Sequence, residues 1–396
     1  MITSLLIKNF RSLRNVSLEL RDRNVFIGPN KSGKTSLLDA LRFLCQAMTV
    51  GDVSRPVNER GGLAGIVWKG TPEALEPLVH PQTLGPIEFQ LDGELPLQAE
   101  TSARFSYYLS IAGDLRGQVT IKRETLDVTM EHSKRRLVDM SGGEGVAKRW
   151  NGTELFSNPG DSKKPALSYD IPGWEAGMIK ARIVLWHFFD LIPQLAKATS
   201  NTSAAVTALD MHGANLSSWI HTLQVNYPAD FNRIAKVVRD AFPEIESLGT
   251  VVTQAGTTFL TSREKFLQSP ITLFEASAGE LNFIALMSLI YSPFEVPLIC
   301  VEEPENHLHP RLLSLLVEMV DQRRIELKGR VSQTILTTHS PYLVDLLEPE
   351  DIVLVSKEHG ETFFRRPESG DELRRLMRAS EETLGRLWFR GSLGDP

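Results

Sequence analysis

A glycine-rich stretch near the N-terminus limits the fold of this chain more than any other feature. Residues 28–35 read Gly-Pro-Asn-Lys-Ser-Gly-Lys-Thr and match the pattern G-x-x-x-x-G-K-[ST]. A short apolar strand pattern at 24–27 leads into the stretch, and apolar residues recur at helical spacing over 35–48. In such a strand–loop–helix unit, glycines let backbone N–H groups surround a phosphate, and the helix N-terminus adds its dipole. The stretch therefore predicts a phosphate-binding loop (P-loop) in an α/β fold.

The loop supplies specific candidate ligands for a nucleotide. Lys34 can reach the β- and γ-phosphates, and the Thr35 hydroxyl can coordinate Mg²⁺. Lys31 brings a second positive charge close to the phosphates. An incidental glycine turn is the alternative, and the strand before the loop and the helix after it disfavour that interpretation. The other candidate nucleotide-binding residues of this segment are Asn30, Ser32, Gly33 and Ser36.

A second stretch ends an apolar strand in two adjacent carboxylates. Residues 298–303 read Leu-Ile-Cys-Val-Glu-Glu. Glu302 is the candidate Mg²⁺ ligand, and Glu303 is the candidate base that orients and deprotonates an attacking water. A solvated acidic strand end is the alternative, and the upstream P-loop favours the functional interpretation.

Two further candidates for the site, His339 and the segment that begins at Ser277, are indicated by their positions next to a predicted strand and a predicted helix. His339 ends the apolar strand pattern 333–338, and open α/β sheets bind ligands at the carboxyl ends of their strands. Its imidazole can hydrogen-bond a γ-phosphate or the attacking water. Residues 277–280, Ser-Ala-Gly-Glu, precede an apolar helix and fit a helix-capping box as well as a phosphate contact. A similar stretch at 141–145 is followed by polar residues, and we interpret it as a glycine turn.

The remaining patterns predict an α/β protein with an insertion. Half-buried antiparallel strands are predicted at 87–91, 105–111, 118–122 and 125–130. Hairpins and a loop are predicted at 133–164, helices at 174–196 and 216–242, and a hairpin at 251–260. From residue 279 onward, apolar strands alternate with helices, which indicates a parallel sheet covered on both faces. We expect three parts: 1–165 with the P-loop and an antiparallel β region, 166–265 as a helical lobe, and 266–396 with the acidic strand and His339.

Composition excludes some classes of protein and leaves others open. A formal net charge of -6 over 396 residues argues against a broadly basic surface for nucleic acid, while local basic patches stay open. The candidate patches are Lys134-Arg135-Arg136, Lys163-Lys164, and Arg374, Arg375 and Arg378. Only two cysteines, Cys45 and Cys300, occur, both in apolar stretches, which fits a reducing cytoplasm. The most apolar segment, 283–291, is far shorter than the roughly 20 residues that span a bilayer, so we expect no membrane association.

Together these motifs resemble those of the ABC-type ATPases of the SMC/RecF/OLD group, within the P-loop NTPases. The resemblance is strongest to short bacterial ATPases related to RecF and to the ATPase half of OLD nucleases. It extends over both ends of the chain and, more thinly, over the middle. The residues that carry it are Ile7-Lys8-Asn9-Phe10-Arg11-Ser12, the P-loop, the Ser277 motif, residues 302–310 (Glu-Glu-Pro-Glu-Asn-His-Leu-His-Pro), Thr338-His339-Ser340-Pro341, 213–216 and 384–388.

The resemblance implies ATP and Mg²⁺ as ligands and a homodimer in which two protomers enclose two ATP molecules. It implies that Ser277 and Gly279 contact the γ-phosphate bound by the other subunit. Glu302 is then the magnesium ligand, Glu303 the general base and His339 the switch histidine. The resemblance also assigns Arg11 and Ser12 to nucleotide contact, and it makes Gln82 the candidate for the metal-contacting glutamine, in competition with Gln46 and Gln90.

This chain departs from the family pattern at several positions. Lys31 replaces a small residue, Glu302 stands where Asp is commoner, Ala278 alters the signature, and His309 occupies the place of an aspartate. These changes bear on the rate of hydrolysis more than on nucleotide binding. Little chain follows His339, and it lacks the acidic cluster that a metal nuclease needs.

The resulting hypothesis is an ATP-dependent dimer that acts as a switch in DNA repair or in defence against phage. An alternative is a nucleotide-gated scaffold that controls a separate effector nuclease, which is favoured because we expect no nuclease domain after His339. The third alternative, the soluble motor of an ABC transporter, is disfavoured by the Pro304-Glu305-Asn306 loop and by the long insertion before Ser277. Double-stranded DNA is a candidate partner through the basic patches alone.

Overall fold

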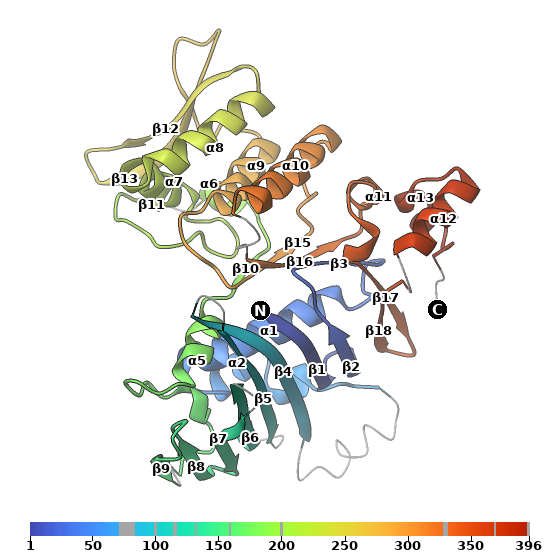
Figure 1. The fold of residues 1–396 in the computed structure, drawn as a ribbon. Coiled ribbons are helices and arrows are strands. Elements are labelled where there is room, and N and C mark those ends of the chain that lie inside the picture. Colours follow the sequence, from blue (N-terminus) through green and yellow to red (C-terminus); the bar gives the residue numbers. More distant parts are fainter. Residues whose placement is uncertain are drawn as a thin grey trace.

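The computed structural model describes residues 1–70, 84–98, 101–113, 117–130, 133–157, 160–198, 201–327, 332–367 and 370–393. Two large sheets dominate these residues (Figure 1). The first is an eight-stranded antiparallel sheet in the order β2-β1-β4-β5-β6-β7-β8-β9. Its strands are β1 (Ile2–Phe10), β2 (Leu13–Glu19), β4 (Leu84–Gln98), β5 (Thr101–Gly113), β6 (Val119–Met130), β7 (Ser133–Ser141), β8 (Glu144–Lys148) and β9 (Glu154–Ser157).

The second sheet has six strands and carries the P-loop. Its order is β10-β15-β16-β3-β17-β18, and all neighbours are parallel except β17 and β18. The bounds are β10 (His187–Phe189), β15 (Leu298–Glu302), β16 (Gln333–Thr338), β3 (Arg23–Ile27), β17 (Ile352–Glu358) and β18 (Glu361–Arg365). The parallel strands end at one edge, so the segments that follow β3, β15 and β16 meet there.

Helices cover both faces of this second sheet, as the sequence predicts. Along β3, Phe26 packs into the core that contains α1 (Lys34–Val50), whereas Val25 and Ile27 pack with α11 (Pro341–Val344) and α13 (Leu384–Phe389). Along β15, Cys300 faces the α1 core and Val301 faces α9 (Ala278–Ile290) and α10 (Pro310–Glu326). Alternate strand residues therefore enter different cores, which explains why these strands are apolar on both sides.

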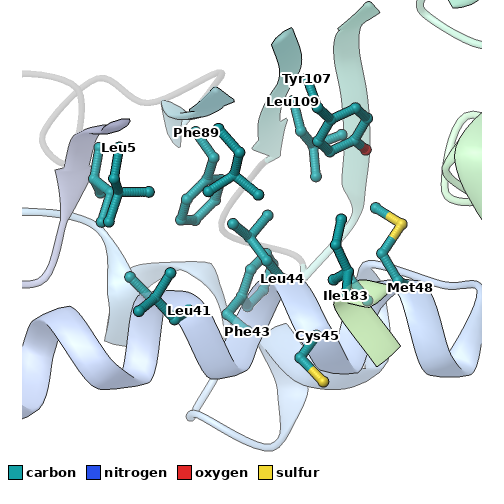
Figure 2. Packing of buried hydrophobic residues seen from close by; sticks show 14 of the residues in the cluster. Leu5, Leu41, Phe43, Leu44, Cys45, Met48, Phe89, Tyr107, Leu109 and Ile183 are labelled. Carbon is teal, nitrogen blue, oxygen red and sulfur yellow. The ribbon is translucent and has the colours of Figure 1, made fainter. Parts of the chain in front are cut away.

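Helix α1 lies between the two sheets and joins them into one core. Figure 2 shows Leu41, Leu44 and Met48 of this helix pointing toward strand residues such as Phe89 and Leu109. The rings of Phe43 and Phe89 stack with their centroids 5.4 Å apart. Because α1 begins directly after the P-loop, this packing fixes the position of the loop relative to both sheets.

The lobe above the six-stranded sheet is built from helices and a small sheet (Figure 1). Its elements are α6 (Pro193–Ala198), β11 (Asn201–Thr202), α7 (Leu216–Asn226), α8 (Pro228–Ala241), β12 (Ile245–Val252), β13 (Thr257–Glu264) and β14 (Ile271–Thr272). They share a core with α9 and α10. The other helices are α2 (Ser54–Asn58), α3 (Leu63–Ile66), α5 (Gly177–Val184) and α12 (Gly370–Ser380).

Three predictions of local structure are wrong. The helix predicted at 216–242 is two helices, because α7 ends at Asn226 and Pro228 begins α8. The predicted helix 174–196 is interrupted, because 187–189 form β10 and pair with β15 at the edge of the parallel sheet. The two strands predicted at 118–122 and 125–130 are one strand, β6. Its pairing with β5 shifts at Ser110 and Ile111, which leaves Lys122 as a β-bulge that breaks the alternation of the sequence.

The buried carboxyl of Glu124 on β6 makes stability depend on pH. Burial raises its pKa to about 7, although the backbone N–H groups of Leu167 and Ala166 and the Tyr107 hydroxyl donate hydrogen bonds to it. A pKa above the unfolded value of 4.5 means that the folded chain holds this proton more tightly. The group therefore stabilises the fold below about pH 4.5, and that contribution, up to about 3 kcal/mol, is lost as the pH rises to about 7.

We expect urea unfolding at pH 5 and pH 8 to show this loss in the wild-type chain and not in Glu124→Gln. The comparison is the difference between the two proteins at each pH, because it cancels the titration of other groups. An identical pH dependence of the free energy of unfolding in both proteins would show that Glu124 is ionised throughout.

No helix among the described residues is both long enough and apolar enough to cross a membrane.

Candidate nucleotide-binding site

The P-loop connects β3 to α1 and folds around the side chain of Lys34. The Lys34 ammonium donates hydrogen bonds to the carbonyl oxygens of Gly28 at 2.7 Å and Pro29 at 3.0 Å. Burial lowers the pKa of Lys34, and the charges of Glu303, Glu305 and Glu302 oppose that shift. The ammonium is thus held at the centre of the loop, where a phosphate would replace the two carbonyls as its partner.

Two segments distant in sequence, the turn at Ser12 and strand β18, contact the P-loop and support it. The Thr362 hydroxyl on β18 donates to the carbonyl oxygen of Ser32 at 2.9 Å and lies within hydrogen-bond distance of Ser12 Oγ, at 2.7 Å. Ser12 Oγ donates in turn to Ser36 Oγ at 3.1 Å. Gly33 has φ +111° and lies so close to Thr362 that an added Cβ would be 2.0 Å from its Oγ1. Ser12 and Ser36, both predicted site residues, therefore support the loop from the side of Thr362.

Thr35 and Glu302 come together where a metal would bind. The Thr35 hydroxyl donates to Glu302 Oε2 at 3.0 Å, although 267 positions separate the two residues. Burial raises the pKa of Glu302, and the hydrogen bond from Thr35 opposes the shift. Hydroxyl and carboxylate oxygens are the ligand types that Mg²⁺ takes together with phosphate oxygens and water. The described residues hold no group of three or more His, Cys, Asp or Glu side chains suited to a metal, so the protein alone offers only part of a coordination shell.

Glu303 and His339 form a direct pair at the ends of neighbouring strands. His339 Nδ1 lies 3.0 Å from Glu303 Oε1, and both side chains are partly exposed. Glu303 has φ +43°, a left-handed conformation that is strained for a residue with a side chain. Successive side chains of a strand point to opposite faces of the sheet. Because Glu303 adopts this left-handed conformation at the end of β15, it can lie at the same edge of the sheet as Glu302. The structure thus brings Lys34, Thr35, Glu302, Glu303 and His339 to one edge of the sheet.

Ser277 caps helix α9 and stands apart from this cluster. Its Oγ accepts a hydrogen bond from the backbone N–H of Glu280 at 3.0 Å, which is half of the predicted capping box. Ser277 itself is exposed. The start of α9 contacts the loop after β15: a Cβ at Gly279 would lie 2.6 Å from the carbonyl oxygen of His307, and Asn282 Nδ2 donates to the carbonyl oxygen of Asn306 at 2.6 Å.

The other predicted site residues have mixed placements. Arg11 has φ +51° and forms an ion pair of 2.7 Å with the buried carboxylate of Asp39 on α1, which Arg42 and Arg60 also contact. Lys31 is exposed, with φ +67°, and Asn30 is exposed beside it. Gln82 lies outside the described residues. Of its competitors, Gln46 donates to Glu59, and Gln90 lies on β4 next to Asp92.

Several residues of the candidate basic patches contact other side chains of the chain, and three of them, Lys134, Arg136 and Arg374, pair with acids. Lys134 and Arg136 both contact Asp127, and Arg135 stacks over the Trp150 ring. Lys164 lies over the ring of Tyr169. Arg374 is held by Glu350, Glu348 and Asp371. The three ion pairs reduce the positive charge that Lys134, Arg136 and Arg374 could offer to a phosphate backbone.

Sequence reasoning missed two residues of the site. Thr362 supports the P-loop from the far end of the chain, and the sequence around it carries no signal of that role. Glu305 is buried between the loops that carry Glu303 and His339 and accepts a hydrogen bond from the Thr338 hydroxyl at 2.5 Å. Its repetition in Glu302-Glu303-Pro304-Glu305 was a signal that could have been used.

Comparisons with known proteins agree with this geometry. A family model described as "AAA ATPase domain" matches residues 1–75, which include the P-loop. A second, described as "AAA domain, putative AbiEii toxin, Type IV TA system", matches residues 186–345, which include Glu302, Glu303 and His339. The two segments that carry the candidate site thus resemble AAA-type ATPase domains, and neither model covers half of the chain. No curated protein matches it.

Solved structures of SMC head domains are also similar to this chain. An Smc head bound to the C-terminal winged-helix domain of ScpA superposes with a TM-score of 0.53 at 12% identity, over 92% of this chain and 97% of that chain. The SMC head domain from Thermotoga maritima is similar at a TM-score of 0.45 and 14% identity, over 93% of this chain and 99% of that one. The Smc head domain from Pyrococcus furiosus gives 0.49 and 11%, over 96% and 99%. The first of these likenesses establishes a shared fold.

Proposed function

We propose that this chain binds Mg²⁺-ATP and hydrolyses it in a dimer of two copies. The observation that carries the proposal is the meeting of Lys34, the Thr35–Glu302 pair and the Glu303–His339 pair at one edge of the parallel sheet. These are the parts that phosphoryl transfer to water needs: a phosphate cradle, a metal position and a base beside the attacking water.

Each side chain has a role that its surroundings support. Bound Mg²⁺ would supply charge neutralisation at the β- and γ-phosphates, with Thr35 and Glu302 as its protein ligands. Lys34 binds the same phosphates from the loop. Glu303 orients the attacking water and accepts its proton. His339, held by Glu303 through Nδ1, presents Nε2 on the opposite side of its ring for a hydrogen bond to the γ-phosphate.

In the proposed dimer, the second copy supplies this cluster with one further contact to the phosphate. Ser277 is exposed at the N-terminus of α9, where unpaired N–H groups and the helix dipole favour an anion. We propose that it contacts the γ-phosphate held by the P-loop of a second copy. One such donor is worth on the order of 10²–10³ in rate, by analogy with single oxyanion-hole donors, so a lone subunit should hydrolyse ATP slowly.

The biological role is proposed from the description of one family model. That model names a putative toxin of a type IV toxin–antitoxin system, which favours a defence role over DNA repair. The ion pairs of Lys134, Arg136 and Arg374 with acids of the same chain weigh in the same direction, since they reduce the charge available for double-stranded DNA. Within a defence role, the ATP-bound dimer would be the signalling state and a separate effector nuclease its candidate target.

Glu303→Gln tests the ATP-dependent dimer. The amide keeps the shape of the side chain but accepts no proton from water, so bound ATP should persist and hold two copies together. We expect light scattering to show twice the mass of the protomer with Mg²⁺-ATP and a single protomer without nucleotide. If the resting chain is already oligomeric, closure of pairs is followed by crosslinking between cysteines introduced at Ser277 and Asn30. A mass and a crosslinking yield that both ignore ATP would refute the proposal.

A further inference from the structure

Glu305 is a buried carboxylate that the proposed reaction does not yet use. Its side chain is 8% exposed. Oε1 accepts hydrogen bonds from the Thr338 hydroxyl at 2.5 Å and from the backbone N–H of His339 at 3.1 Å. The same oxygen lies 3.7 Å from His339 Nδ1. Among the described residues, the other carboxylate oxygen, Oε2, is buried and has no hydrogen-bond partner.

The negative charge at this position is costly for the fold. Removing a carboxylate from water is unfavourable unless its oxygens are paired, and one oxygen of Glu305 is not paired. A glutamine of the same shape would accept both hydrogen bonds with a smaller loss of hydration. The carboxylate of Glu305 favours the charged form of Lys34 at the centre of the P-loop. Its hydrogen-bonded oxygen faces the segment that begins with Thr338 and His339.

The contacts of Glu305 join the two loops that carry the reacting groups. Its own loop follows β15 and contains Glu303, while its hydrogen bonds go to the end of β16, where His339 begins the next loop. The bonds continue into the helix behind it: the backbone N–H of Ser340 donates to Thr338 Oγ1, and Ser340 caps α11. A shift of the Glu305 side chain would consequently move His339 relative to Glu303.

We propose that Glu305 is a positioning residue that sets His339 for hydrolysis. It fixes Thr338 and the backbone of His339, so that Nδ1 of the imidazole stays against Glu303 and Nε2 is free for the phosphate. This inference rests on the proposed ATPase function. In this proposal Glu305 acts through His339 and does not itself contact the nucleotide or the attacking water.

A double-mutant cycle separates positioning from general support of the fold. Steady-state ATP hydrolysis is measured for the wild type, Glu305→Ala, His339→Ala and the double variant. We expect Glu305→Ala to lower kcat by about 10- to 100-fold with the KM for ATP changed less than about 3-fold. In the His339→Ala background, the same substitution should change kcat by less than about 2-fold, because the residue through which it acts is gone.

Two variants of Thr338 test the same positioning role independently, in case the Glu305→Ala protein does not fold. Thr338→Ser keeps the hydroxyl that donates to Glu305 and should retain kcat, whereas Thr338→Val keeps the shape without the hydroxyl and should lose kcat as Glu305→Ala does. Equal kcat losses from Glu305→Ala with and without His339, or equal rates for the two Thr338 variants, would overturn the positioning role. A wild-type chain without Glu303-dependent hydrolysis would remove the proposed function, and this inference with it.

Discussion

Gly33→Ala is expected to weaken ATP binding strongly. Gly33 has φ +111°, and the added Cβ would lie 2.0 Å from Thr362 Oγ1 and 2.9 Å from Ser12 Oγ. Neither neighbour can give way easily, because Thr362 is 2% exposed and its hydroxyl and backbone N–H are bonded to Ser12 and Ser32. The P-loop must therefore move off its support, and its N–H groups lose their convergence on the phosphate. We expect the Kd for Mg²⁺-ATP, measured by calorimetry, to rise by on the order of 100-fold or more.

Gly62→Ala is the matched control for this prediction. Gly62 also has a positive φ, +82°, but an added Cβ there would meet no atom within 4 Å. The control variant therefore places an alanine at positive φ without the collision, and it should bind ATP as the wild type does. An unchanged Kd in Gly33→Ala, or equal losses in both variants, would show that Thr362 does not support the loop.

The second large effect is expected from two variants that damage opposite halves of the shared site. Lys34→Met removes the ammonium at the centre of the P-loop and keeps most of the buried stem. Ser277→Asp keeps the cap of α9, because aspartate is a good N-cap residue, and places a negative charge where the other copy's γ-phosphate would lie. We expect each variant alone to lose at least about 100-fold in kcat. Ser277→Thr, which keeps both the cap and the hydroxyl, should stay close to the wild-type rate.

The fold was predictable where one local pattern determined one structure. The order of elements from residue 279 onward follows from apolar strands alternating with helices, and β3, the P-loop and α1 follow from the motif. The prediction failed at β10, because three residues carry too little pattern to compete with the helical spacing around them. It also failed at β6, where the bulge at Lys122 disrupts the alternation on which a strand prediction depends.

The charged residues of the candidate site could be predicted from the sequence, whereas a residue that supports the P-loop could not. Glu302, Glu303 and His339 could be found because each ends an apolar strand, and the parallel order places those ends at one edge. Thr362 could not be found, because its role depends on β18 lying against the Ser12 turn, a contact between residues 350 positions apart. Arg11, predicted from the resemblance to contact nucleotide, is paired with Asp39 in the structure, and its contact with nucleotide stays a prediction.

The central claim is that two copies build each ATP site, and a mixture of Lys34→Met and Ser277→Asp tests it most directly. Neither variant alone can build an intact site. In a mixed dimer, the P-loop of the Ser277→Asp chain faces the intact Ser277 of the Lys34→Met chain, so one complete site forms. At equal proportions we expect the mixture to recover about a quarter of the wild-type rate per chain, since half of the dimers are mixed and each has one of two sites intact. A mixture no faster than the mean of the two separate variants would contradict the account.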